Sequence, residues 1–162
     1  MSKYIDSIYQ VSNNPFMLTP LIVEFYRKLE STQKNILLSY LVLPLVLNNK
    51  SKEALITANT RSSIFGFVSN KKNSDGIKHV ENIFGLPQRI REYKELTNKC
   101  VQHAIDNKWI VINDDLSVDV LTSINDFSCE LEDSYKAASN LYKIFKDLDV
   151  VTIYRLLGIK KL

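Results

Sequence analysis

The most apolar segment of the chain reads Ile36-Leu37-Leu38-Ser39-Tyr40-Leu41-Val42-Leu43-Pro44-Leu45-Val46-Leu47. Apolar side chains fall on every side of it, a pattern typical of a helix or a central strand that is buried all round. Pro44 has no N–H group to donate to a β-ladder and argues against a central strand. We therefore predict a buried helix that is kinked or ends near Pro44. Because the segment is well short of the roughly 20 residues that span a bilayer, it predicts a core element and not a membrane span.

Another helix is predicted before this segment. Asn14-Pro15 and Thr19-Pro20 each pair a favourable helix-capping residue with a proline, which is well tolerated at the first helical position. The helix is expected to begin at one of these two pairs. The apolar residues that follow at helical spacing are Leu18, Leu21, Ile22, Phe25 and Leu29.

Short helices and a turn are predicted after the apolar segment. Ser51 is suited to cap a helix that runs through Ala58. A further helical piece is predicted over residues 61–68. Its inward-facing residues are expected to be Ile64, Phe65 and Val68. The sequence Asn-Ser-Asp-Gly at residues 73–76 predicts a turn.

The second half of the chain begins with its longest predicted helix, which Pro87 opens and which ends near Asn107. Two β-rich runs, residues 109–112 and 117–120, then flank the turn-forming segment Asn113-Asp114-Asp115-Leu116 and predict a hairpin. A long helix that runs straight into a hairpin is how the recognition helix and wing of a winged-helix domain look in sequence.

The C-terminal third returns to helix. Its apolar stripe consists of Leu131, Tyr135, Ala138, Leu141, Ile144, Phe145 and Leu148. A last short helix is predicted from Val150 to Leu157, and Gly158 is suited to end it in the left-handed conformation.

The whole chain is predicted to form one domain. Its 162 residues, 45% of them hydrophobic, are enough for one core and too few for two. The expected fold class is mainly α: a single helical domain over residues 1–162 with a small β-hairpin near residues 109–120, winged-helix-like. Cys100 and Cys129 do not make a disulfide framework, and the N-terminus does not read as a secretory signal, so a cytoplasmic location is expected.

No residue is predicted to be catalytic, and no cofactor or metal site is expected. The four glycines do not form either of the standard phosphate-binding loop patterns. Cys100 and His103 stand three apart on the long helix, a spacing that permits metal ligation or nucleophilic catalysis. Core packing explains Cys100 better, because it falls on the apolar face. The run Asn113-Asp114-Asp115 is likewise expected to be a turn and not a metal site. The chain is therefore not predicted to be an enzyme.

Basic residues are the remaining candidates for contact with DNA or a partner protein. The net charge of +3 is too small an excess to indicate nucleic-acid binding by itself. The candidates are Arg61, Lys71, Lys72, Lys78, His79, Arg89, Arg91, Arg155, Lys160 and Lys161. Arg89 and Arg91 lie early in the long helix, which enters a DNA groove in winged-helix proteins. A solvated loop and a basic tail beside a helix C-terminus explain the same charges without a partner.

Several segments carry a resemblance to a known family. Asn14-Pro15-Phe16 precedes an apolar helix, residues 41–47 follow the pattern Leu-x-Leu-Pro-Leu-x-Leu, and Lys52-Glu53-Ala54-Leu55 comes next. The ending at residues 153–159, Ile-Tyr-Arg-Leu-Leu-Gly-Ile, belongs to the same pattern. Together these segments resemble the middle component of bacterial three-component ABC-type systems over nearly the whole chain.

This resemblance implies a small non-enzymatic subunit that works with a large SMC-like ATPase subunit and a third, effector subunit that often carries a nuclease, as in Lamassu-type defence against phage and plasmids. The leading hypothesis is a scaffold that bridges ATPase and effector, with DNA contact possible through the complex and no membrane partner. The alternative is a stand-alone winged-helix DNA-binding regulator. An enzyme built on Cys100 and His103 is a third alternative.

Overall fold

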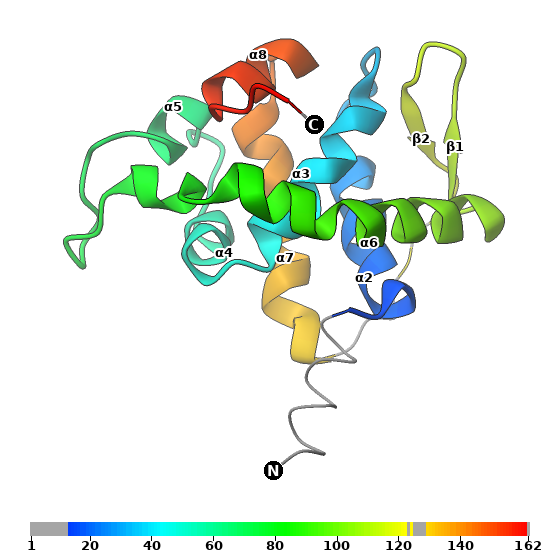
Figure 1. The fold of residues 1–162 in the computed structure, drawn as a ribbon, viewed down its shortest axis with the longest axis horizontal. Coiled ribbons are helices and arrows are strands. Elements are labelled where there is room, and N and C mark those ends of the chain that lie inside the picture. Colours follow the sequence, from blue (N-terminus) through cyan, green and yellow to red (C-terminus); the bar gives the residue numbers. More distant parts are fainter. Residues whose placement is uncertain (1–12, 123, 125–128, 162) are drawn as a thin grey trace.

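The structure consists mainly of helices with one hairpin (Figure 1), which confirms the predicted fold class. The computed structural model describes residues 13–122, 124 and 129–161. The α-helices are α2 (Pro15–Lys28), α3 (Ser39–Val46), α4 (Asn49–Ile56), α5 (Ile64–Phe67), α6 (Leu86–Asp106), α7 (Glu132–Phe145) and α8 (Val150–Leu156). The strands are β1 (Ile110–Ile112) and β2 (Val118–Val120). The 3-10 helices among the described residues are η1 (Asn35–Leu38), η2 (His79–Ile83) and η3 (Cys129–Leu131).

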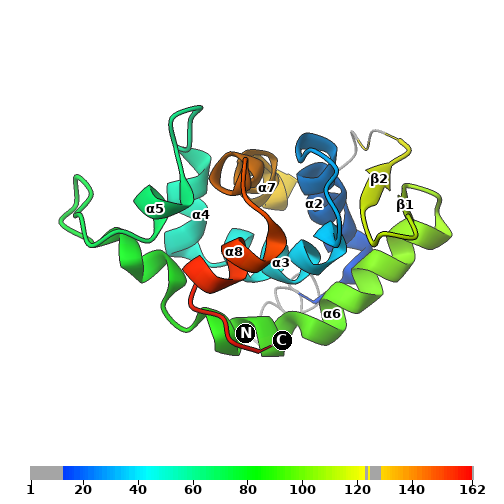
Figure 2. The same ribbon diagram turned by 90° about the horizontal axis from the view of Figure 1, so that it is seen from above.

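Helix α3 lies at the centre of the fold, between the pair α2 and α7 on one side and α6 on the other (Figures 1 and 2). Its apolar side chains belong to one continuous core to which each of α2 to α8 contributes. The fully buried ones are Leu41, Val42, Leu43, Leu45 and Val46. The predicted buried helix is therefore confirmed, and it ends two residues after Pro44.

Tyrosine side chains from other helices bind the backbone at the start of this apolar segment. Tyr26 Oη donates to the carbonyl oxygens of Asn35 at 2.8 Å and Ile36 at 3.1 Å. Tyr154 Oη donates to the carbonyl oxygen of Leu37. Helices α2 and α8 are thus tied to η1 by hydrogen bonds as well as by apolar packing.

The end of α3 is bound in the same way, because the last carbonyls of a helix have no partner within it. Ser51 Oγ donates to the carbonyl of Leu45, and Arg89 Nη1 donates to that of Pro44 at 2.7 Å. The prediction that Ser51 caps the next helix is wrong. Asn48 takes that position, and its side chain accepts a bond from the Ser51 N–H group. Asn and Ser are about equally favourable at the N-cap of a helix, so residue type alone does not show whether Asn48 or Ser51 takes that position.

Helix α2 begins at the first of its two candidate starts. The Asn14 side chain accepts a hydrogen bond from the N–H group of Phe16 at 2.9 Å, and Pro15 takes the first helical position. Pro20 lies inside the helix. The predicted apolar stripe is buried from Leu18 to Phe25.

Helix α5 differs from its prediction in length and in the face that it buries. It covers only Ile64–Phe67, after a cap by Ser63. Ile64 and Phe67 are buried, whereas Phe65, which we expected to point inward, is 62% exposed. Residues three apart share a helix face, and neighbours do not. Because Ile64 faces the core, Phe67 faces the core as well, and Phe65 lies on another face of the helix.

Helix α6 leads directly into the antiparallel hairpin, in which Ile110 pairs with Val120 and Ile112 with Val118. The predicted hairpin is confirmed, and so is the order of long helix and hairpin on which the likeness to a winged-helix domain rests. The hairpin is docked on η1, since the N–H group of Val118 donates to Asn35 Oδ1 at 2.8 Å.

The C-terminal helices agree with the sequence analysis. Helix α7 packs against α2 and α4, and α8 contacts η1 and α5. Gly158 follows α8 with φ +74°, the left-handed conformation predicted for it. Among the described residues, no helix has the length and apolar character needed to cross a membrane.

Leu43 offers a test of the central core. We expect Leu43→Asp to lower the free energy of unfolding by on the order of 4 kcal/mol or more, because it places an unpaired carboxylate where no solvent reaches. Urea denaturation measures this change. The control is Leu121→Asp, because Leu121 is 58% exposed. A Leu43→Asp variant that unfolds at the parent's urea concentration would contradict the core assignment.

Candidate docking surface

Three of the predicted contact residues lie together in the loop between α5 and η2, which projects from one end of the molecule (Figures 1 and 2). Lys72 and Lys78 form an isolated antiparallel bridge, and the N–H group of His79 donates to the carbonyl of Lys71 at 2.9 Å. Asn73 accepts two backbone N–H groups inside the predicted turn, which is confirmed. We call this exposed loop, with Lys71, Lys72 and Lys78, the lysine loop.

Two arginines of the predicted set are exposed outside the lysine loop. Arg61 lies between α4 and α5, and Arg91 lies on the solvent face of α6. None of the ion pairs found in the described part of the chain includes either of them. Their predicted contact with DNA or a partner stays a prediction.

Arg89, in contrast, points into the protein. Besides its bond to Pro44, Nη2 donates to the carbonyls of Asn82 at 3.1 Å and Phe84 at 3.2 Å. Desolvation by partial burial lowers the pKa of Arg89, and Nε is buried without a partner among the described residues. These bonds give the guanidinium a structural role that the sequence analysis missed, since they reach carbonyls up to 45 residues away.

Arg89 and Arg91 form a matched pair for testing this role. We expect Arg89→Met to lower the free energy of unfolding by about 1–3 kcal/mol, because it leaves the Pro44 carbonyl without its charged donor. Arg91→Met should change it by no more than ~0.5 kcal/mol, since Arg91 is exposed. Urea midpoints of the two variants measure the difference. Equal midpoints would contradict the structural role of Arg89.

Cys100 and His103 occupy packed positions. Cys100 is fully buried, with Sγ 3.7 Å from the carbonyl oxygen of Pro15, which confirms its predicted place in the core. The His103 ring meets the rings of Phe16 and Trp109 edge-on, with centroids 4.7 and 5.3 Å away. Within the described ranges, no three His, Cys, Asp or Glu side chains are grouped to hold a metal ion. Burial raises the pKa of the Cys100 thiol to about 11, the opposite of what a nucleophile needs.

Thiol chemistry tests this environment. At pH 8 a thiol reagent should modify exposed Cys129 in the native protein and reach buried Cys100 only after denaturation. Stability should also fall as the pH rises from 9 to about 11, because the unfolded chain, whose thiol has the ordinary pKa, loses its proton first.

Comparison with Cys100→Ala isolates this contribution, since the variant should lose stability less steeply over that pH range. Two fast-reacting thiols in the native protein would show that Cys100 is accessible.

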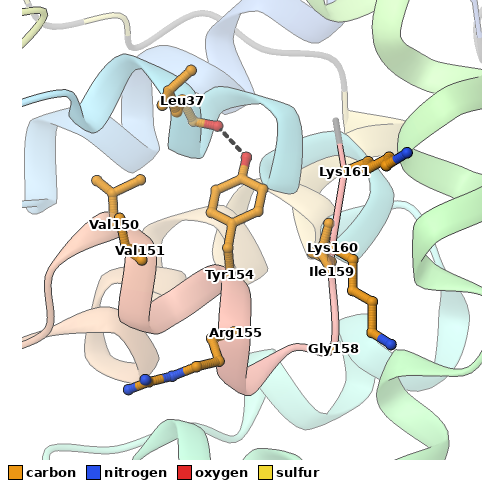
Figure 3. Close-up of a pocket in the computed structure, with 9 residues that line it drawn as sticks. All are labelled: Leu37, Val150, Val151, Tyr154, Arg155, Gly158, Ile159, Lys160 and Lys161. Carbon is orange, nitrogen blue, oxygen red and sulfur yellow. Dashed lines mark hydrogen bonds between the residues drawn. The ribbon is translucent and has the colours of Figure 1, made fainter.

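A groove of about 460 Å³ lies between α8, the chain that follows it, and η1 (Figure 3). Tyr154 lies in it with its hydroxyl on the Leu37 carbonyl. Val150 and Ile159 are 7% exposed and form its buried part, whereas Val151 is 74% exposed. We call it the C-terminal groove. Its lining residues are Leu37, Val150, Val151, Tyr154, Arg155, Gly158, Ile159, Lys160 and Lys161.

The positive φ of Gly158 shapes this groove. After α8 the N–H group of Ile159 donates to the carbonyl of Tyr154 at 3.0 Å, so the chain turns back beside its own helix. This turn places Lys160 and Lys161 across the groove from Arg155 (Figure 3). The chain reversal therefore brings residues before and after Gly158 onto one surface.

All charged residues that line the groove are basic. Arg155, Lys160 and Lys161 are exposed, and no Asp or Glu of the described residues belongs to the lining. None of these three takes part in an ion pair with the described residues. The C-terminal groove thus combines an apolar surface with three cations that have no carboxylate partner in the described chain.

Comparison with protein families identifies the chain. A family model described as ABC-three component (ABC-3C) system Middle Component 3 matches residues 2–161. The chain belongs to this family. Neither curated proteins nor solved structures gave a match. The resemblance noted in the sequence is confirmed at the level of three-component ABC systems, and the family's description makes the chain one component of a system with several.

In this middle component, the sequence analysis found the basic part of the C-terminal groove and missed the apolar part. Arg155, Lys160 and Lys161 were candidates by charge. Leu37 comes from η1, more than a hundred residues earlier, so spacing along the chain gives no sign of it. The exposure of Val151 depends on how α8 is rotated against the core, which seven helical residues do not determine.

Proposed function

We propose that this middle component is a non-enzymatic scaffold subunit of a Lamassu-type defence complex against phage and plasmids. In this proposal it bridges an SMC-like ATPase subunit and an effector subunit that carries a nuclease, in the cytoplasm. The observation that carries the proposal is the family match over residues 2–161, since a middle component is one part of a larger system. The Lamassu assignment rests on the resemblance of the sequence alone.

Two features of the described residues support a connecting role. Of the two side chains most suited to catalysis by their spacing, Cys100 is buried in the core, and the half-buried His103 ring packs edge-on against Phe16 and Trp109. The lysine loop and the C-terminal groove are both open to solvent and belong to different elements. Both features suit a subunit that works by binding.

The rival function, a stand-alone winged-helix regulator, requires α6 to enter the major groove of DNA. The exposed basic residues of α6 are matched in number by exposed acidic ones. The basic ones are Arg91, Lys94 and Lys99, and the acidic ones are Glu92, Glu95 and Asp106. Lys99 Nζ also pairs with Glu95 Oε1 at 3.0 Å. A face without excess positive charge gains little from phosphates, which supply most non-specific affinity for DNA.

DNA binding and subunit capture separate the two functions. We expect the isolated chain to bind duplex DNA with a Kd no tighter than about 10⁻⁶ M at physiological salt, in a titration at several salt concentrations. Co-expressed with the SMC-like ATPase, the chain should retain that subunit in a pull-down. The Lys71→Glu/Lys72→Glu variant should still assemble and should change DNA binding by the complex only modestly.

Tight, sequence-selective binding of duplex DNA by the chain alone, with no ATPase retained, would contradict the scaffold and favour the regulator. Loss of assembly in the Lys71→Glu/Lys72→Glu variant would instead show that the lysine loop contacts a protein subunit.

A further inference from the structure

The C-terminal groove has a composition that suits a protein segment better than a nucleic acid. A DNA backbone recognised through its phosphates needs cations and leaves an apolar surface without a partner. Here the three cations share the groove with Val151, which is exposed, and Tyr154, which is half-buried, and the surfaces of both stay in contact with water until an apolar group covers them. A partner that matches both features carries apolar side chains between carboxylates.

The elements around the groove indicate which shape of segment fits. Its described lining residues come from η1, α8 and the turn after α8, and none of them lies in a strand, so they offer no strand edge to pair with. Within the described ranges Tyr154 is the single aromatic residue in the lining, whereas grooves that bind proline-rich peptides are lined with aromatic rings. The remaining mode of peptide recognition is a helix that lays apolar side chains at positions i, i+3 and i+4 into the groove.

We propose that the C-terminal groove docks a short amphipathic helix of a partner subunit, with apolar residues on Val151 and Tyr154 and carboxylates against Arg155, Lys160 and Lys161. This inference rests on the proposed function, because the helix belongs to another component of the complex. The groove follows α8, whose 7 residues extend about 10 Å, so two to three turns of partner helix cover it.

The apolar and the basic residues of the groove should affect different rate constants of binding. Val151 and Tyr154 belong to the apolar part of the groove, where the bound helix excludes water, so changing Val151 should mainly raise the dissociation rate. Arg155, Lys160 and Lys161 are exposed, and exposed charge mainly sets the association rate and its dependence on salt. These differences can be measured separately on the purified subunit and its partner.

Four variants test the inference by kinetic binding measurements against the SMC-like ATPase subunit and against the effector subunit. Val151→Glu should weaken binding to one of them at least tenfold, and Leu121→Glu, which makes the same kind of change at another exposed site, should not. The triple change Arg155→Glu/Lys160→Glu/Lys161→Glu should slow association at least tenfold at low salt. Lys28→Glu/Lys108→Glu/Lys136→Glu, at exposed lysines outside both the groove and the lysine loop, alters the net charge equally and should leave association within about twofold. Circular dichroism confirms that each variant is folded.

Cross-linking identifies the bound segment. The photoreactive residue p-benzoylphenylalanine replaces Val151, or Leu121 as the control, in the chain co-expressed with both other subunits. We expect light to join position 151, and not position 121, to a segment with apolar residues spaced for a helix and flanking Asp or Glu. Capture of a basic or wholly polar segment, cross-linking to DNA, or binding unchanged in Val151→Glu would overturn the docking site while leaving the proposed function intact. Failure of the unmodified chain to retain either subunit would overturn the proposed function and, with it, this inference.

Discussion

The fold depends on satisfying the backbone at both ends of one apolar segment. A helix that is apolar all round can be buried completely, but the carbonyl groups at its C-terminal end have no partner inside the helix. Each such group, buried and unpaired, costs about 1–3 kcal/mol. Tyr26 and Tyr154 supply donors at the start of the segment, and Ser51 and Arg89 supply them at its end. Because these four side chains come from α2, α8, α4 and α6, placing η1 and α3 also places the elements around them.

The same constraint builds the C-terminal groove. The Tyr154 hydroxyl satisfies the Leu37 carbonyl, and its ring is thereby held where it lines the groove. Burial raises the pKa of Tyr154, so the hydroxyl stays protonated and continues to donate at physiological pH. A surface fixed by a core interaction is present before any partner arrives. Such pre-organisation reduces the ordering cost of binding.

Elements that are determined by neighbouring residues were predicted better than contacts between residues that are far apart in the sequence. The apolar segment, the hairpin and the turn at Gly158 follow from neighbouring residues and are confirmed, and α2 begins at the first of the two starts that its neighbouring residues offered. Phe65 was misplaced because a helix of one turn carries too few apolar positions to define its buried face. Arg89 looked like surface charge because the carbonyls that it binds, above all that of Pro44, come close only in the folded chain. Leu37 meets residues 150–161 for the same reason, so its place in the groove had no signal in the sequence.

The distribution of charged residues over the surface, more than the net charge, favours a scaffold subunit over a DNA-binding regulator. An excess of +3 is modest, and on α6 exposed acids balance exposed bases, whereas the lysine loop and the C-terminal groove each carry three exposed basic side chains. Both are anchored to the core. Asn82 Nδ2 donates to the carbonyl of Phe67 at 2.9 Å and holds η2, which follows the lysine loop, against α5, while Tyr154 holds the groove against η1. A subunit that connects two partners needs two surfaces whose separation does not change when one is occupied. One continuous core beneath both surfaces meets that requirement, whereas a DNA reader needs its charge concentrated on the recognition helix.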